Sequence, residues 1–369
     1  MRVNNFVNIC DVSKEIFAGG DAPKGNMSIE KTLKYSIPIF SNGEANDGLY
    51  GYTDFYRVSE PSITISARGT IGYAAIRTEP FVPIVRLIVI TPKIEIVDIK
   101  YLYYAIKNYD FSKSGTSIPQ LTVPMLKHYS FPLPPLPEQR RIAAVLDKVS
   151  ELIALRKKQL ALLDEMVKAR FVEMFGDPVR NEKSYPIKHL SDVAEYWNGL
   201  TYKPEDISEK GIIVLRSSNI QNFKLDYSDI VRVSCKISQK KYVQANDILM
   251  CSRNGSAKLV GKVALIDNIN EPMSFGAFMM IIRSNLYSYL HTYFQLPAFR
   301  LQITTGATTT INQITTNMLN KIVLPIPNEE SISQFADFVQ QVEKSKATVQ
   351  QALEKLELLK SALMQAYFG

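Results

Sequence analysis

The chain has 369 residues, of which 46% are hydrophobic and 21% charged, a composition that indicates two or three folded domains and excludes a disordered chain. Three scattered cysteines exclude a disulfide scaffold, and no apolar run approaches the length of a membrane span. We therefore expect a cytoplasmic protein with no membrane partner. The net charge of +7 is compatible with a polyanionic partner.

Residues 1–137 are predicted to form a mostly-β domain of the α+β class. Short β-branched and aromatic stretches alternate with turns rich in Gly, Asn, Asp and Ser, for example in residues 36–48 and 82–93. Residues 100–110 are the helical stretch of this domain. Between two apolar strands, the segment SARGTIG (66–72) is predicted to form a polar, glycine-containing loop.

Residues 138–176 are predicted to form one long helix. Pro137 and Glu138 suit a first helical turn, and Gly176 followed by Asp177-Pro178 is a typical stop signal. Apolar residues recur with a 4,3 spacing, which is a coiled-coil signal, and the predicted helix is about 57 Å long. This row of apolar positions is the predicted seam of the helix, and it contains Ile142, Leu146, Val149, Ile153, Leu160 and Leu163.

Residues 177–327 have the same mostly-β character, with predicted strands in 211–220 and 277–285 and a helical stretch in 287–296. They carry 17 basic and 12 acidic side chains, so most of the positive charge lies here. A second long helix is predicted in residues 328–369, with Asn328 as its N-cap. Its seam contains Phe335, Phe338, Val342, Val349, Leu356 and Leu359.

The sequence contains an internal repeat. The stretch TSIPQLTVPMLKHYSFPLP (116–134) aligns without gaps with TTINQITTNMLNKIVLPIP (309–327) at an offset of 193 residues, with 8 identities in 19 positions. The same offset places the seam of one long helix on that of the other. The chain is therefore predicted to be two copies of one unit, each a globular domain followed by a long helix.

A helix of this length cannot bury its seam against its own domain alone, so the two long helices are predicted to pair with each other in antiparallel orientation. The predicted fold class is thus α+β, with two mostly-β domains separated by two long antiparallel coiled-coil helices and an internal pseudo-two-fold repeat. Binding of each helix to a different protein is the alternative.

The segment PLPPLPEQRRIAAVLDKVSELIALRKKQLALLDEM (132–166), with the FGDP stop after it, resembles the central conserved region of the specificity subunit of type I restriction–modification enzymes. The loop SARGTIG and the stretch GTSIPQLT (115–122) are similar to recurrent features of that family's target-recognition domains. The second copy departs from the pattern, because NEESISQF replaces PEQRRI. The resemblance covers essentially the whole chain. It implies target-recognition domains at 1–137 and 177–327, a central conserved spacer helix at 138–176 and a C-terminal conserved spacer helix at 328–369.

The resemblance also implies partners. The chain would bind double-stranded DNA at a bipartite, asymmetric target, with one domain on each half-site. Two methylation subunits would dock through the helices and use S-adenosylmethionine, and motor-nuclease subunits would use ATP and Mg²⁺. No cofactor and no metal are expected on this chain itself.

Base edges are read by hydrogen-bonding side chains, which we expect on loops that project from a rigid scaffold. Arg suits guanine O6 and N7, Asn suits adenine N6 and N7, and glycine permits a tight turn. A solvated loop side chain is the alternative interpretation for each candidate, and Gln120 and Gln313, which recur in register, equally suit a bracing role. The candidate DNA-binding residues are Ser41, Asn42, Arg68, Gly69, Thr70, Thr116, Ser217, Asn219, Arg253, Asn254, Ser256 and Thr309.

No catalytic site can be assembled from the sequence. The Gly-rich cofactor loop and Asn/Asp-Pro-Pro-aromatic motif of adenine methyltransferases are absent, and so is a P-loop. The best match to a nuclease motif, Asp98-Ile99-Lys100, lacks an acidic partner, and a turn at the end of a strand is the better interpretation. Scattered histidines (His128, His189 and His291) predict no metal site. We therefore predict a non-catalytic subunit.

Two other functions stay open at this point. The first is a coiled-coil scaffold that carries two protein-binding domains and has no DNA role. The second is an enzyme with a split active site, for which we find no residue cluster. Steep salt dependence and sequence dependence of DNA binding would separate a DNA reader from the scaffold.

Overall fold

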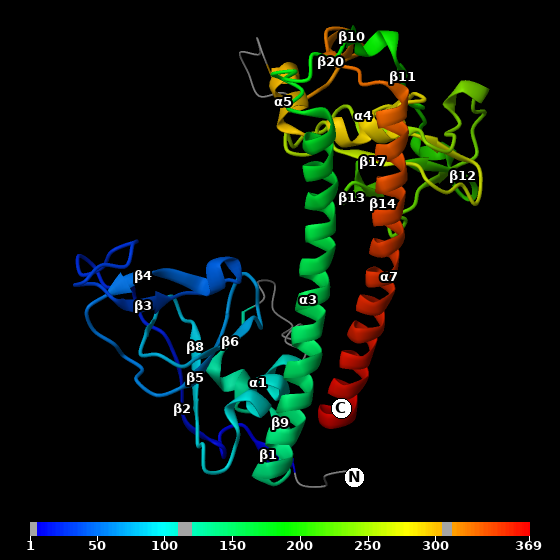
Figure 1. Cartoon of the computed structure of the whole chain (residues 1–369). Coiled ribbons are helices and arrows are strands. Elements are labelled where there is room, and N and C mark those ends of the chain that lie inside the picture. Colours follow the sequence, from blue (N-terminus) through cyan, green and yellow to red (C-terminus); the bar gives the residue numbers. More distant parts are fainter. Residues whose placement is uncertain (1–5, 110–119, 305–311) are drawn as a thin grey trace. The chain divides into compact units, whose positions relative to one another are not determined.

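The computed structural model describes residues 6–109, 120–304 and 312–369. The chain divides into two compact units, which we call unit 1 (residues 1–157 and 350–369) and unit 2 (residues 158–349). Each unit contains a half of both long helices, which are drawn in green and red in Figure 1. The helices are α1 (Ile99–Asn108), α2 (Val123–Leu126), α3 (Leu136–Phe175), α4 (Tyr287–Tyr293), α5 (Pro297–Thr304), α6 (Thr316–Asn320) and α7 (Glu329–Phe368).

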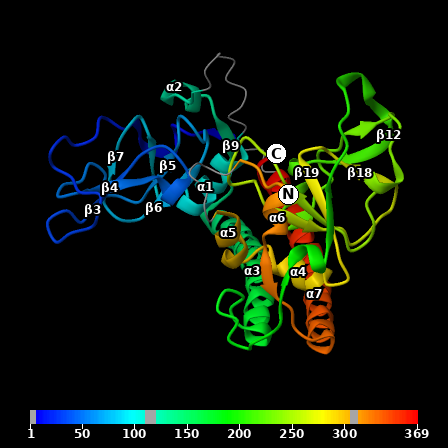
Figure 2. The same ribbon diagram turned by 90° about the horizontal axis from the view of Figure 1, so that it is seen from above.

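Unit 1 contains a four-stranded antiparallel sheet in the order β2-β8-β5-β6. A three-stranded sheet, whose strands β3, β4 and β7 are labelled in Figure 2, has the order β4-β3-β7 and includes one parallel pair, β3 with β7. Strand β1 pairs with β9. These strands are β1 (Phe6–Asn8), β2 (Ser13–Ala18), β3 (Ile37–Phe40), β4 (Leu49–Thr53), β5 (Ser62–Ile65), β6 (Ala74–Arg77), β7 (Val82–Pro83), β8 (Ile88–Pro92) and β9 (Ser130–Pro132).

The central strands β5 and β8 are buried along their whole length, and they are rich in the β-branched residues that suit a covered pleated surface. Helix α1 contributes its buried face to the same core. Its Tyr101 is fully buried and donates a hydrogen bond from Oη to the Pro132 carbonyl, 2.7 Å away. Unit 1 is therefore a mixed α/β structure built on a rigid central sheet.

Unit 2 has the same set of sheets. Its four-stranded antiparallel sheet has the order β11-β19-β16-β17, its three-stranded sheet has the order β15-β12-β18 with β12 parallel to β18, and β10 pairs with β20. A short β13–β14 hairpin is added. These strands are β10 (Ile187–His189), β11 (Glu195–Asn198), β12 (Ile207–Leu215), β13 (Ile220–Gln221), β14 (Lys224–Leu225), β15 (Arg232–Val233), β16 (Ile248–Cys251), β17 (Val263–Leu265), β18 (Met273–Phe275), β19 (Met279–Arg283) and β20 (Val323–Pro325).

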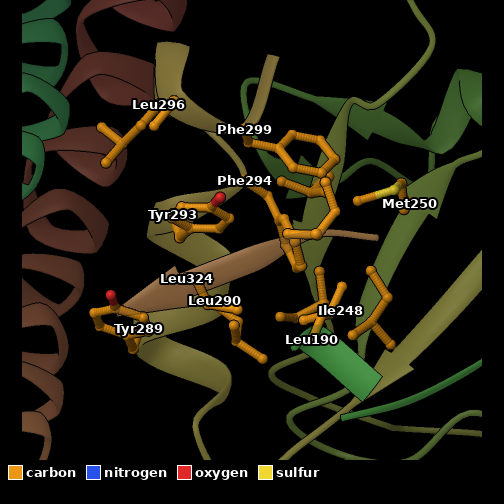
Figure 3. Close-up of a cluster of buried hydrophobic side chains, with 14 of the residues drawn as sticks. Leu190, Ile248, Met250, Tyr289, Leu290, Tyr293, Phe294, Leu296, Phe299 and Leu324 are labelled. Atoms are coloured by element: carbon orange, nitrogen blue, oxygen red, sulfur yellow. The ribbon is translucent and has the colours of Figure 1, made fainter. Parts of the chain in front are cut away.

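The main core of unit 2 lies between its sheet and helices α4 and α5 (Figure 3). Ile248 and Met250 point into it from β16, and Tyr289 and Tyr293 from α4. Tyr289 donates from Oη to the Pro325 carbonyl at 2.6 Å, which repeats the bond of the buried Tyr in unit 1. The strands and helical stretches predicted in both halves of the sequence are thus confirmed.

Both long helices have 40 residues, and they begin and end 193 residues apart. Asn328 caps α7 as predicted, because its Oδ1 accepts from the Ser331 amide at 2.8 Å. Gly176 ends α3 with a φ of +76°, a left-handed conformation that glycine adopts without strain.

Within each unit the two helices run antiparallel and touch. In unit 2, Phe171 of α3 packs edge-to-face on Phe335 of α7, and Asp164 pairs with Lys346. In unit 1, Lys157 of α3 pairs with Glu357 of α7 at 2.9 Å. Antiparallel contact is therefore present in both units, and the helix ends also enter the globular cores.

The seam of α3 lies where the sequence predicts, with Ile142, Leu146 and Val149 buried and the later positions half-buried. In α7 the seam differs in part. Leu359, predicted to pair, is 46% exposed, whereas Leu353, six residues earlier, is 5% exposed. The remaining predicted positions are buried (Phe335, Val342 and Val349) or half-buried (Phe338 and Leu356), as are Ile153, Leu160 and Leu163 of α3.

The seam of α7 also contains a charged residue. Lys346 is 7% exposed and takes a position in the seam, whereas its neighbour Ser345 is exposed. Burial lowers the pKa of Lys346, but its ion pairs with Asp164 and Glu343 outweigh burial and leave the pKa raised. The lysine therefore remains charged within the helix pair, and an apolar spacing pattern does not detect it.

Candidate nucleic-acid interface

The first candidate loop of unit 1 joins β5 to β6. The Ser66 amide donates to the Tyr73 carbonyl at 2.8 Å, and the Gly72 amide donates to the Ser66 carbonyl at 3.0 Å, so the base of the loop is closed by its own backbone. Arg68, Gly69 and Thr70 at its tip are all exposed. Gly69 has a φ of +69°, which only glycine adopts readily.

A second loop, residues 41–48, is tied to the first. The Ala67 amide donates to Asn42 Oδ1 at 2.7 Å, and Asn42 Nδ2 donates to the Val85 carbonyl at 2.6 Å. The Gly43 amide donates to Ser66 Oγ at 2.9 Å. Asn42 was predicted to contact DNA, but its side-chain amide instead joins the two loops. Ser41, next to it in the same loop, is half-buried.

A third segment completes the edge. Arg68 Nη2 donates to Gln120 Oε1 at 2.9 Å, and the Leu121 amide donates to the Ala67 carbonyl at 3.0 Å. Gln120 therefore holds the guanidinium of the loop tip. Thr116, predicted in the same segment, lies outside the described residues.

Unit 2 brings together the corresponding segments. Its loop after β16 carries Arg253, exposed, with the guanidinium over the Phe278 ring at 5.3 Å from the ring centre. Asn254 Nδ2 donates to Ser217 Oγ at 3.1 Å, and Asn254 Oδ1 accepts from the Ser256 amide at 3.0 Å. Loop 252–256 is thus tied to the loop that follows β12.

The third segment of unit 2 is bound in the same manner as in unit 1. The Ile314 amide donates to the Ser252 carbonyl at 2.7 Å, and Arg253 forms an isolated backbone bridge with Gln313. Ala67 and Ser252 each directly precede the loop arginine of their unit. The hydrogen bond that the third segment donates to this carbonyl therefore recurs in both units. Thr309 lies outside the described residues.

We call these groups of loops the three-loop edges. The edge of unit 1 comprises residues 41–48, 66–72 and 120–122, and the edge of unit 2 comprises residues 216–219, 252–256 and 312–314. Among the described residues, no carboxylate lies within ion-pair distance of Arg68 or Arg253. Both arginines are exposed at the tip of a braced loop.

Asn219 has a different role from the one predicted. It is 1% exposed, its Nδ2 donates to the carbonyls of Asp226 (2.8 Å) and Asp229 (2.9 Å), and its Oδ1 accepts from the Arg216 amide at 2.8 Å. Because the amide is buried and bonded at both ends, it fixes the loop and does not face solvent. Ser217, next but one, is half-exposed and bonded to Asn254.

Sequence reasoning missed a polar cluster beside the edge of unit 1. Arg77, at the end of β6, is 7% exposed and pairs with the Asp47 carboxylate. Tyr73 donates from Oη to Asp47 Oδ1 at 2.6 Å. Burial and the bond to Asp47 together raise the pKa of Tyr73 to about 12, so its hydroxyl stays protonated as a donor. An arginine at the end of a strand does not by itself indicate a buried ion pair, so the sequence contains no signal for this cluster.

The residues once considered for chemistry have structural roles. Asp98 caps α1, because its Oδ1 accepts from the amides of Lys100 (3.0 Å) and Tyr101 (3.1 Å). Lys100 Nζ lies 2.6 Å from Asp147 on α3. Within the part of the chain that the structure describes, no three or more His, Cys, Asp or Glu side chains are grouped as metal ligands would be.

Of the helices in the described ranges, none combines the length and the apolarity that crossing a bilayer requires.

The fold and the loops together define a mixed α/β protein with two long paired helices and a braced polar edge in each unit. A family model described as "Type I restriction modification DNA specificity domain" matches residues 4–165 and, separately, residues 182–358. Since these matches cover most of the chain, the chain belongs to this family. The resemblance found in the sequence is confirmed.

Individual relatives agree with this assignment. A putative type I specificity subunit of Mycoplasma pneumoniae is 37% identical over 168 residues, which are 42% of this chain and 50% of the relative. A second subunit from the same organism is 38% identical over 166 residues, 42% of this chain and 45% of the relative. This chain therefore spans about half the length of these two relatives. The MjaIX specificity subunit of Methanocaldococcus jannaschii is 23% identical over 94% of this chain and 85% of its own.

Solved structures show the same fold. The crystal structure of a type I restriction–modification system S subunit from M. genitalium has a TM-score of 0.60 at 14% identity and covers 100% of this chain and 97% of its own. A structure reported on complex assembly and conformational transition of the type I restriction–modification system has a TM-score of 0.56 at 18% identity, with 98% and 96% covered. At these identities the likeness concerns the fold alone.

Proposed function

We propose that this chain is a non-catalytic reader of DNA sequence, the specificity subunit of a type I restriction–modification enzyme. The observation that carries the proposal is the recurrence of the three-loop edge. In each unit, an exposed arginine stands at the tip of a loop that two other segments hold against a rigid sheet. A braced loop loses little freedom on binding, which favours discrimination between bases.

The chemistry of the two tips suits base reading. A guanidinium without a carboxylate partner can donate two parallel hydrogen bonds to guanine O6 and N7 in the major groove. Arg68 is backed by the neutral amide of Gln120, and Arg253 by the Phe278 ring. Both supports orient the cation and leave its charge for the nucleic acid. Thr70 and Ser256, exposed on the same loops, supply further hydroxyl groups.

We further propose a bipartite, asymmetric target. The reading domains would be residues 1–137 and 177–327, and because their loop sequences differ, each would prefer a different half-site. The helices in 138–176 and 328–369 would act as a pseudo-symmetric coiled-coil spacer. A helix of 40 residues is about 60 Å long. A spacer of that length would hold half-site centres roughly one to one and a half DNA turns apart.

The partners follow from the family. Two methylation subunits, which carry S-adenosylmethionine, would dock through the helices, and motor-nuclease subunits would bring ATP and Mg²⁺. This chain would supply no cofactor of its own. The matched family consists of DNA specificity domains, and the sequence lacks methyltransferase and P-loop motifs. The purified chain alone should therefore neither methylate nor cleave DNA.

Methylation mapping of the host genome, with and without this gene, tests the proposal. We expect one split motif whose methylation disappears when the gene is deleted. Unchanged methylation together with sequence-independent DNA binding by the purified chain would instead favour the scaffold with protein-binding domains.

A further inference from the structure

We propose that Asp47, Arg77 and Tyr73 form a positioning clamp, through which the buried Arg77 sets the sequence preference of the three-loop edge of unit 1 without itself touching DNA. This inference rests on the proposed function. It assigns a role to residues that no sequence motif singles out.

Arg77 makes a dense set of contacts. Its Nη1 pairs with the Asp47 carboxylate, its Nη2 donates to the Asp47 carbonyl at 2.7 Å, and its Nε donates to Thr64 Oγ1 at 3.2 Å. The guanidinium also lies over the Phe40 ring, 3.7 Å from its centre. With the side chain only 7% exposed, Arg77 is held in place and cannot reach a base edge.

Asp47 is gripped from two positions of one hairpin. Tyr73 donates to Oδ1 and Arg77 to Oδ2, so both carboxylate oxygens are bonded to residues at or near β6. The aspartate itself stands in loop 41–48, which belongs to the three-loop edge. The clamp therefore fixes this loop relative to the hairpin whose tip carries Arg68.

The backbone of the loop turns sharply at the clamp. Asn46 and Asp47 have φ values of 50° and 53°, in the left-handed region that Asn and Asp tolerate better than other residues with a side chain. Gly48 has a φ of +74°, and a Cβ there would lie 2.7 Å from the Ser41 carbonyl oxygen. Without the ion pair, residues 45–48 would relax toward ordinary conformations, and Asn42 and Gly43 would move with them.

The clamp belongs to unit 1. In unit 2 the corresponding loop, residues 216–219, is fixed by the buried amide of Asn219 instead. Loss of the clamp should consequently affect one half-site and leave the other unchanged. Arg77 is not a phosphate contact in this account, so the salt dependence of binding should also stay unchanged.

The test uses the full chain with its methylation subunits and duplexes that carry the mapped motif or single-base changes in either half-site. The variants are Asp47→Asn, which weakens the ion pair, and Arg77→Lys, which keeps the charge and loses the planar fork. Tyr73→Phe is a third, milder variant that removes one hydroxyl. We expect discrimination in the half-site read by unit 1 to fall about tenfold for the first two. Discrimination in the other half-site and the salt slope should match the unaltered protein.

Glu60→Gln is the matched control. Lys14 and Glu60 also form an ion pair in unit 1, at 2.5 Å, but Glu60 precedes β5 whereas the reading loop follows it. This control should bind like the unaltered protein. Circular dichroism and the thermal midpoint of each variant verify folding, and Tyr73→Phe carries the test if the ion-pair variants unfold.

Three outcomes would count against the inference. If folded Asp47→Asn and Arg77→Lys variants retain full discrimination, the clamp is refuted and the proposed function is not. Equal loss in both half-sites also overturns it. An unaltered protein that shows no sequence preference at all overturns the proposed function, and the clamp with it.

Discussion

At the scale of single residues, the arginines at the loop tips carry the reading hypothesis. Arg68 is exposed, braced by Gln120 and free of a carboxylate partner among the described residues. The hydrogen bond to Gln120 thus orients the guanidinium, and no described carboxylate pairs with it. The same is true of Arg253 above the Phe278 ring.

Arg68→Ala should relax specificity in one half-site only. A bidentate arginine–guanine contact is worth about 1–3 kcal/mol of discrimination, so we expect the preference at one base pair to fall roughly 5- to 160-fold. Competition binding with single-base variants of the motif measures this. The control Lys24→Ala removes an exposed cation of unit 1 outside the three-loop edge, and it should leave the preference unchanged. Equal loss in both half-sites would contradict the assignment of one unit to each.

Residues also show where sequence reasoning stops. The pattern of polar loops after apolar strands singled out segments that the structure brings together, and Ser41, Asn42 and Arg68 meet in one unit. The sequence pattern could not distinguish Asn42 and Asn219, whose side-chain amides brace the loops, from side chains that face solvent. That distinction depends on carbonyls far along the chain, such as those of Val85 and Asp229.

At the scale of elements, the seam of α7 offers a direct test of the helix pair. The sequence favours Leu359 because it continues a strict 4,3 spacing. The structure instead covers Leu353, and it also buries Lys346, which pairs with Asp164. Spacing therefore predicted the two helices and most of their seams, but not a buried charge.

Leu353→Ala should destabilise unit 1 by about 2–5 kcal/mol, since it leaves a cavity in a covered site. Leu359→Ala, on an exposed position of the same helix, should cost less than about 1 kcal/mol. Urea unfolding followed by circular dichroism compares them. A larger loss for Leu359→Ala would restore the predicted seam and refute the observed one.

The helix α4 carries a second prediction at this scale. Burial lowers the pKa of His291 to about 4, although the charge of Glu343 opposes the shift. The folded protein therefore excludes a proton that the unfolded chain binds below about 6.5. Stability is complete above that pH and declines as the pH falls toward 4. Glu343, whose pKa is lowered from 4.5, adds loss only at still lower pH.

Between pH 7 and pH 5, the free energy of unfolding of unit 2 should drop by roughly 2 kcal/mol. Trp197, the single tryptophan, lies in unit 2 and reports this transition by fluorescence. His291→Gln should remove most of the drop, whereas His189→Gln, at an exposed position of β10, should retain it. A drop of the same size in His291→Gln would show that other groups cause it.

At the scale of the whole molecule, the internal repeat is what the sequence predicted most fully. The 193-residue offset predicted two long helices in corresponding positions, and both have 40 residues. The β-strand pairs β1–β9 and β10–β20 and the backbone bond beside each loop arginine also recur, although the sequence did not predict them. The order of strands in the sheets was not accessible, because pairing joins segments that are distant along the chain. The sequence placed most of the net charge of +7 in residues 177–327, but only the structure shows that Arg68 and Arg253 are exposed at loop tips.

The most direct test of the central claim is competition binding to four duplexes: the mapped motif, the motif with either half-site scrambled, and both scrambled. Each is measured at two salt concentrations with the methylation subunits present. The account predicts that scrambling one half-site weakens binding, that scrambling both weakens it further, and that every affinity falls steeply with salt. Equal affinity for all four duplexes would contradict it.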